Sequence, residues 1–114
     1  MTDAERLANL KILLEDGGDV PSDEKLNVYL AAAKSYILTW RYHLVGGVPE
    51  DVTDVPTEYQ WSQIYAVLAG YTHAGAEGEV RHVENGVTRE YRETDMLRYI
   101  EANVLALARV GAVR

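Results

Sequence analysis

The feature that most constrains the fold is an apolar stripe that runs for about five helical turns through residues 22–44. Its members recur at the i, i+3, i+4, i+7 spacing of one face of an α-helix. They are Leu26, Tyr29, Leu30, Ala33, Tyr36, Ile37, Trp40 and Leu44. Ser22 is a typical N-cap residue, and Asp23 and Glu24 favour the positive end of a helix dipole. The stripe therefore predicts a central core helix, roughly 33 Å long at about 1.5 Å per residue.

A shorter helix is predicted before the central one. Thr2 and Glu5 form a capping box, in which each side chain satisfies a backbone N–H of the other residue. The apolar side of this helix carries Leu7, Leu10, Leu13 and Leu14. The glycines of Asp16-Gly17-Gly18 end it, because glycine is the usual residue just past a helix terminus.

Two further helices are predicted in the second half of the chain. Thr57 with Gln60 forms another capping box, and the third helix is expected to end near Ala74. Its predicted buried stripe is Trp61, Ile64, Tyr65, Leu68 and Tyr71. The fourth helix is expected to begin at Thr94 and end at Gly111, with a stripe of Leu97, Ile100, Val104, Leu107 and Ala108. Between the second and third helices, residues 46–56 contain two prolines, two glycines and three acids, which predicts a solvated connector.

The segment from Gly75 to Tyr91 does not continue the helical pattern. Asn85-Gly86 separates two β-prone runs, and Asn-Gly favours the type I′ turn of a β-hairpin, so a hairpin is predicted at about 79–91. Eight of the nineteen residues from Gly75 to Glu93 are charged, which predicts that the ribbon projects. The charges either protect an exposed strand edge or accompany strand pairing with a neighbouring subunit, and the residues favour neither.

The predicted fold class is all-α: a four-helix domain with a long central helix and one inserted β-hairpin between helices 3 and 4. Residues 1–114 form a single domain, since a chain of this length buries roughly two thirds of its unfolded surface. The hairpin occupies about 79–91, and a flexible tail is expected at about 110–114.

The composition excludes several classes of function. The net charge of −7 disfavours binding to phosphates, and the lack of cysteine excludes disulfides and thiolate sites. No histidine pattern indicates a metal, no phosphate loop or nucleophile elbow is present, and no cofactor is expected. We therefore expect no enzyme.

No apolar run approaches the ~20 residues of a membrane span, and the acidic start is unlike a signal peptide, which predicts folding in a cytoplasm.

Several short motifs resemble those of the head–tail connector family of long-tailed bacteriophages, also called adaptor or head-completion proteins. They are the sequence Gly75-Ala-Glu-Gly78-Glu, the following Asn-Gly, the Thr-Arg-x-Tyr return, and the opening residues Glu5 to Leu14. The order of elements is also similar, and the resemblance covers most of the chain. The sequence departs from the family in a longer loop between Val45 and Pro56 and in a third helix rich in Trp and Tyr.

The resemblance implies a structural virion protein that forms an oligomeric ring below the portal. Such a ring connects the DNA-filled head to the tail or stopper protein and extends the channel, through which DNA passes without sequence-specific binding. The expected partners are further copies of the chain, the portal and a stopper, and assembly is expected in the bacterial host cytoplasm. The candidate interface residues are Gly75, Gly78, Arg81, His82, Asn85, Gly86, Arg89 and Tyr91, with Arg109 and Arg114 of the tail and the loop 46–54 as further candidates.

The alternative is a small helical regulator that binds DNA or protein and uses the hairpin as a wing. Its acidity stands against this reading, as does the absence of Lys and Arg between Thr57 and Ala74, where a recognition helix would need them.

Overall fold

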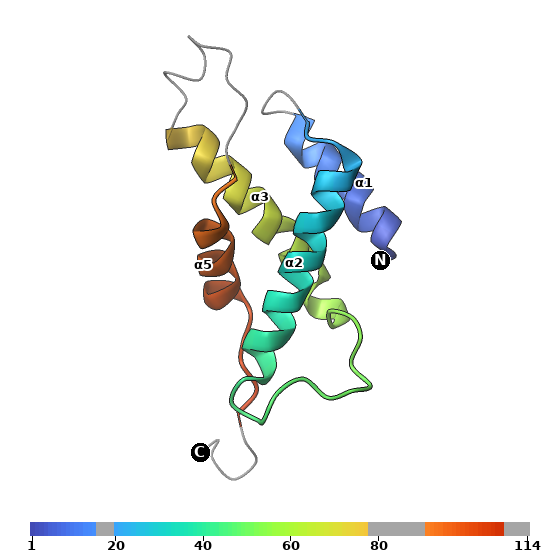
Figure 1. Ribbon diagram of the computed structural model, residues 1–114, viewed down its shortest axis with the longest axis vertical. Helices are drawn as coiled ribbons and strands as arrows, with labels where there is room; N and C mark the ends of the chain where they lie inside the picture. The colour runs from blue at the N-terminus through green and yellow to red at the C-terminus, as the bar shows by residue number, and fades with distance from the viewer. Residues whose placement is uncertain (16–19, 78–90, 109–114) are drawn as a thin grey trace.

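The computed structural model describes residues 1–15, 20–77 and 91–108, and the regular structure in these ranges is entirely helical (Figure 1). The elements are α1 (Asp3–Glu15), α2 (Asp23–Tyr42), the 3₁₀ turn η1 (Thr57–Tyr59), α3 (Gln60–Glu77) and α5 (Glu93–Asn103). The long α2 confirms the helix predicted from the apolar stripe, although it ends at Tyr42 and leaves Leu44 exposed.

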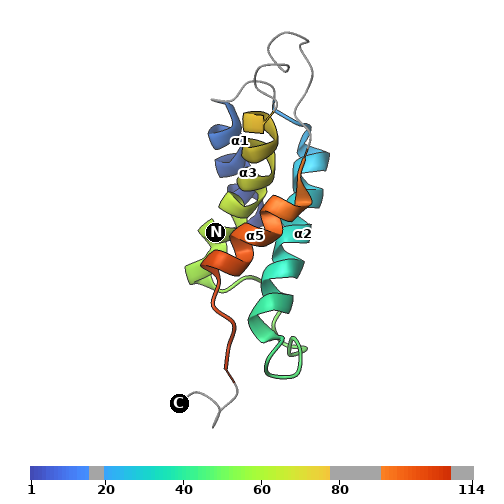
Figure 2. The ribbon, with the colours of Figure 1, turned by 90° about the vertical axis from the view of Figure 1, so that its left-hand side faces the viewer.

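The helices are arranged around α2 and α3, which pack against each other. Helix α1 contacts both of them, and so does α5, but α1 and α5 do not contact each other within the described ranges. They lie on opposite sides of the α2–α3 pair, as Figures 1 and 2 show. Every helix therefore gives one face to a shared core and leaves another face outside it.

The core is built from the apolar stripes of all four α-helices in the described part. Its fully buried members include Leu10, Leu14, Leu26, Leu30, Ala33, Ile37, Ile64, Val67, Met96 and Ile100. Each of these side chains contributes roughly 1.5–3 kcal/mol when it is removed from water, except for the smaller Ala33. Tyr29, Tyr36 and Trp40 of the predicted central stripe are partly buried at the rim of this core.

The predicted helix starts have mixed outcomes. The capping box of α1 is confirmed: the Thr2 N–H donates to Glu5 Oε1 (2.7 Å) and the Glu5 N–H to Thr2 Oγ1 (3.1 Å). The N-cap of α2 is also confirmed, since the Lys25 N–H donates to Ser22 Oγ (3.2 Å). The second capping box was wrong. Residues 57–59 form η1 instead, and the Gln60 side chain bonds elsewhere.

The inserted β-hairpin of the predicted fold class was wrong. No residue in the described ranges forms a strand, and α3 continues past Ala74 to Glu77, through the start of the expected insert. The alanines at 74 and 76 are the best helix formers, and each added helical residue gains a backbone hydrogen bond, which outweighs the cost of Gly75. Tyr91, expected in the second strand, has no strand conformation. Positions 79–90 of the predicted hairpin lie outside the described residues.

The last helix is shorter than predicted. Helix α5 begins at Glu93 without a capping side chain and ends at Asn103 rather than near Gly111. From Val104 the chain is extended. The Val104 N–H still donates to the Ile100 carbonyl of the last helical turn, but the Val104 carbonyl accepts from Trp40 of α2 and the Leu107 N–H donates to the Arg41 carbonyl. Val104 is nevertheless buried, as its place in the predicted stripe requires.

Candidate functional site

Two of the predicted interface residues lie in the described part of the chain. Gly75 belongs to the last turns of α3, and Tyr91 precedes α5. The other eight lie in the ranges 78–90 and 109–114, outside the described residues: Gly78, Arg81, His82, Asn85, Gly86, Arg89, Arg109 and Arg114.

Tyr91 is held in a cluster of tyrosines where the chain returns to the core. Its ring stacks on Tyr29 with the centroids 3.8 Å apart and meets Tyr71 edge-on at 4.7 Å. Its hydroxyl donates to the sulfur of Met96 (2.7 Å). Burial in this cluster raises the pKa of Tyr91 well above its usual range, and the neighbouring tyrosines add to the effect. Tyr91 therefore fixes the point at which the chain re-enters the helical core.

Gly70 makes this close approach possible. A Cβ atom at position 70 would lie 2.5 Å from Cε1 of Tyr91, a distance that real side chains do not tolerate. The Arg92 N–H also donates to the Gly70 carbonyl (3.3 Å). The backbone of α3 and the return at 91–92 are thus in direct contact, because residue 70 has no side chain.

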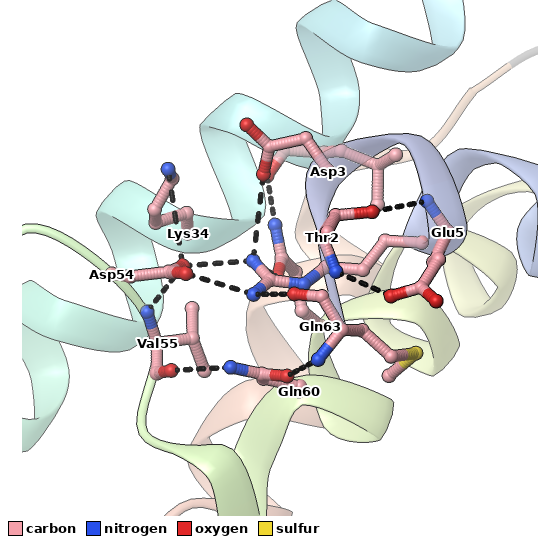
Figure 3. Close-up of polar contacts among 11 residues, drawn as sticks. Thr2, Asp3, Glu5, Lys34, Asp54, Val55, Gln60 and Gln63 are labelled. Carbon is pink, nitrogen blue, oxygen red and sulfur yellow. Dashed lines mark hydrogen bonds and ion pairs between the residues drawn. The ribbon is translucent and has the colours of Figure 1, made fainter.

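A buried arginine, Arg6, joins α1 to the connector and to α3; its partners Asp54 and Gln63 are labelled in Figure 3. The side chain of Arg6 is only 1% exposed. It donates from Nη1 and Nη2 to the two carboxylate oxygens of Asp54, each at 2.8 Å, in the bidentate geometry that suits a guanidinium. Nη1 also donates to Gln63 Oε1 (3.0 Å), and Nη2 to the Met1 carbonyl (2.8 Å). We call Arg6, Asp54 and Gln63 the clasp.

Two glutamines of α3 extend the clasp to its neighbours. Gln63 Nε2 donates to the Leu30 carbonyl of α2 (2.8 Å). The amino group of Met1 donates to Gln60 Oε1 (2.7 Å), while Gln60 Nε2 donates to the Val55 carbonyl (3.1 Å). The first residues, the connector, α2 and α3 are therefore joined by one hydrogen-bond network.

The clasp controls the ionisation of Asp54. The hydrogen bonds from Arg6, together with the Val55 N–H and the charges of Arg6 and Lys34, lower the pKa of this carboxyl from 3.8 to about 2, although partial burial opposes the shift. Sequence reasoning missed the clasp. The available signal was the i, i+4, i+8 spacing of Arg6, Leu10 and Leu14, which are the three buried residues of α1.

A cleft of about 310 Å³ opens beside the clasp, between α1 and α2. Its lining includes Arg6, Asn27, Ala31, Lys34 and Gln63. Although Arg6 is buried, its Nε has no hydrogen-bond acceptor within the described part of the chain. We call this the α1–α2 cleft; it is a polar hollow with hydrogen-bond donors on its walls.

The extended segment after α5 is bound to the C-terminal end of α2. Trp40 Nε1 donates to the Val104 carbonyl (2.8 Å), and Arg41 Nη1 donates to the Leu105 carbonyl (2.9 Å). The Leu107 N–H in turn donates to the Arg41 carbonyl (2.7 Å). These bonds hold residues 104–107 against α2, while the Leu105 side chain remains 74% exposed.

Helix α3 presents aromatic side chains to the outside, contrary to the predicted stripe. Trp61 is 48% exposed and Tyr65 39% exposed, whereas Gln60 and Gln63 are buried. The two rings lie side by side with centroids 6.0 Å apart. The prediction was wrong for Trp61 and Tyr65, because it did not allow for buried glutamines with hydrogen-bond partners, whereas Ile64 and Tyr71 of the same stripe are buried as predicted.

The described residues show little sign of a chemical site. No group of three His, Cys, Asp or Glu side chains in the described ranges is placed to hold a metal ion. None of the helices described is both long and apolar enough to span a bilayer.

Comparison with protein-family models gives one assignment. The model described as "Phage gp6-like head-tail connector protein" matches residues 4–102, which cover the helices given above except for the first residue of α1, Asp3, and the last of α5, Asn103. Comparison with curated proteins and with solved structures gives no match.

Proposed function

This chain belongs to the phage gp6-like head–tail connector family, and from that premise we propose that it forms an oligomeric ring below the portal and extends the DNA channel. Membership makes it a structural protein of the bacteriophage virion that links head and tail. It confirms the resemblance found in the sequence and favours the connector over the regulator. The observation that carries the proposal is the length of the match, because it spans nearly the whole helical domain.

The distribution of charge supports the passage of DNA through such a ring. Residues 43–59 contain four acids and no Lys or Arg, and Glu50, Asp51 and Glu58 among them are exposed. Carboxylates at the surface repel the phosphates of DNA, whereas tight binding would need Lys and Arg. A channel lined by such acidic loops lets DNA slide without sequence-specific binding.

The ring needs contacts between two different surfaces of each copy, because a cyclic assembly is built from head-to-tail interfaces. Further contacts join the ring to the portal on one side and to a stopper or tail protein on the other. The segment 75–91 and the tail residues Arg109 and Arg114 are proposed for these contacts. No catalytic role is proposed, and the ring assembles in the bacterial host cytoplasm.

The test uses DNA-filled phage heads that carry the portal but lack this protein. The purified protein is mixed with the heads, the heads are sedimented, and the pellets are imaged by electron microscopy. A new ring of density below the portal is expected. If the folded protein stays in the supernatant at every concentration, the proposed function is wrong.

The candidate contact residues are tested in the same assay. Arg81→Ala combined with Arg89→Ala removes two cations from the segment 78–90 and should weaken sedimentation with the heads. Arg98→Ala removes an exposed cation of α5 and serves as the control. Equal binding by both variants would remove the segment from the interface.

A further inference from the structure

An exposed aromatic surface lies on α3 and the adjacent part of α5. Trp61 and Tyr65 occupy successive turns of α3, and Tyr99 of α5 is close enough to Tyr65 that their interaction, after burial, raises the pKa of Tyr99. We call these three residues the aromatic face. Residues 57–77 contain no Lys or Arg, and two exposed acids, Glu58 of η1 and Glu101 of α5, accompany the face. The face is therefore apolar and free of cations on α3.

The aromatic face points away from the α1–α2 cleft. Gln63 lines the cleft and bonds to Arg6 and to the Leu30 carbonyl. Trp61 and Tyr65 are each two residues from Gln63, which is about 200° around an α-helix. Trp61 and Tyr65 thus lie on the side of α3 opposite Gln63, so the aromatic face and the cleft are the two different surfaces that a head-to-tail contact requires.

The cleft offers what the aromatic face lacks. Lys34 and Arg6 bring cations to its lining, Asn27 brings an amide and Asp3 a carboxylate. Both cations also pair with Asp54, Arg6 at 2.8 Å and the partly exposed Lys34 at 3.9 Å. All three lysines of the chain are in α1 and α2, at positions 11, 25 and 34. Arg6 Nε is a buried N–H that has no acceptor among the described residues.

We propose that the aromatic face of one copy docks into the α1–α2 cleft of the next copy and so closes the ring. The inference rests on the proposed function and names the lateral contact within it. Trp and Tyr are enriched at the centres of interfaces, and their rings attract nearby cations such as Lys34. The Tyr hydroxyl is also an acceptor for a donor in the cleft.

The test changes each surface separately. Trp61→Ser with Tyr65→Ser removes the aromatic face, and Ala31→Arg fills the cleft; Asn27→Arg is a second cleft variant in case the first does not fold. For each of these variants, the protein concentration that half-occupies connector-free heads should rise at least about tenfold. Loss of central aromatic contacts typically weakens binding affinity by that factor or more. Circular dichroism and thermal unfolding verify that each variant is folded.

Matched controls change similar residues outside the two surfaces. Ile12→Ser removes an exposed apolar side chain of α1, and Val28→Arg adds the same arginine to α2 without lining the cleft. Both controls should bind heads as the unchanged protein does.

Mixing the variants tests the pairing itself. The cleft variant retains its aromatic face, and the aromatic-face variant retains its cleft. Where the two variants alternate around the ring, the intact face of one therefore meets the intact cleft of the other at every second subunit interface. At equal total concentration the mixture should occupy more heads than either variant alone. If it does not, the two surfaces do not pair. If both variants bind as well as the unchanged protein, the inference is wrong while the proposed function stands; if the unchanged protein fails to bind, the proposed function is wrong.

Discussion

Replacing Asp54 with Asn should destabilise the protein by removing the charge that faces the buried Arg6. In the unchanged protein the carboxylate accepts two short hydrogen bonds from the guanidinium. Asn keeps one neutral acceptor in the same place but cannot receive the bidentate pair. The remaining carboxylate close to Arg6 is that of Asp3, 3.7 Å from Nη1 and 79% exposed, which is a weak substitute.

The size of the effect follows from the pKa of Asp54. A fall from 3.8 to about 2 corresponds to about 2.5 kcal/mol of stabilisation, because each pKa unit is worth about 1.4 kcal/mol. The Asp54 side chain is 47% exposed, so solvent screening reduces this contribution. We expect Asp54→Asn to lower the free energy of unfolding by about 1–1.5 kcal/mol and Tm by about 4–6 °C.

The pH dependence gives the sharper test. Since the folded-state pKa is depressed, the stabilisation is complete above the unfolded value near 3.8 and is lost as pH falls toward 2. Urea unfolding of both proteins at pH 6, 4 and 3 should show a difference that is full at pH 6 and shrinks at pH 3. Asp51→Asn, an exposed acid of the same connector, is the control. The reasoning would be refuted if Asp54→Asn lowered the free energy of unfolding no more than Asp51→Asn does, or if its effect at pH 3 were as large as at pH 6.

Three other changes test the contacts of the second half of the chain. Gly70→Ala should lower the free energy of unfolding, measured with urea, by about 1–2 kcal/mol, because its Cβ meets Tyr91. In a Tyr91→Ala background the same change should lower it much less, and an equal effect in both backgrounds would contradict the clash. Above pH 10 the unfolded state loses the Tyr91 proton more readily than the folded state, so stability should fall with rising pH, and Tyr91→Phe should make the fall shallower. Trp40→Phe removes the donor to the Val104 carbonyl (about 1 kcal/mol) and should speed amide hydrogen exchange at Leu107; unchanged exchange would show that the bond does not hold the segment.

The sequence predicts the central helix well because its apolar spacing is long and its cap is simple. Leu26, Leu30, Ala33 and Ile37 of the stripe are buried as expected, and Ser22 caps the helix. It predicts α3 poorly, since periodicity alone cannot tell a buried glutamine from an exposed one. The orientation of α3 depends on Gln63, whose partners Arg6 and Leu30 are distant in sequence.

The candidate site was predicted mainly through the family resemblance. Asn85-Gly86 indicates a local turn. The structure of the surrounding segment also depends on tertiary contacts, which a two-residue pattern does not reveal. Tyr91 is an example of this dependence on tertiary contacts, because its packing on Tyr29 and Tyr71 requires the space left by Gly70 of α3. The exposed Trp61 and the α1–α2 cleft could not be predicted either, since both depend on how the helices are rotated.

The clasp also has a consequence for the protein during its synthesis. Arg6 lies 48 residues before Asp54 and 57 before Gln63. At about 5–20 residues per second, the ribosome adds Gln63 roughly 3–11 s after Arg6. Until Asp54 and then Gln63 have been added, the cation of the first helix lacks these partners, so α1 cannot complete its burial on the nascent chain. The amino-terminal half is therefore expected to dock late, and a truncation before Gln63 should leave α1 without its folded contacts.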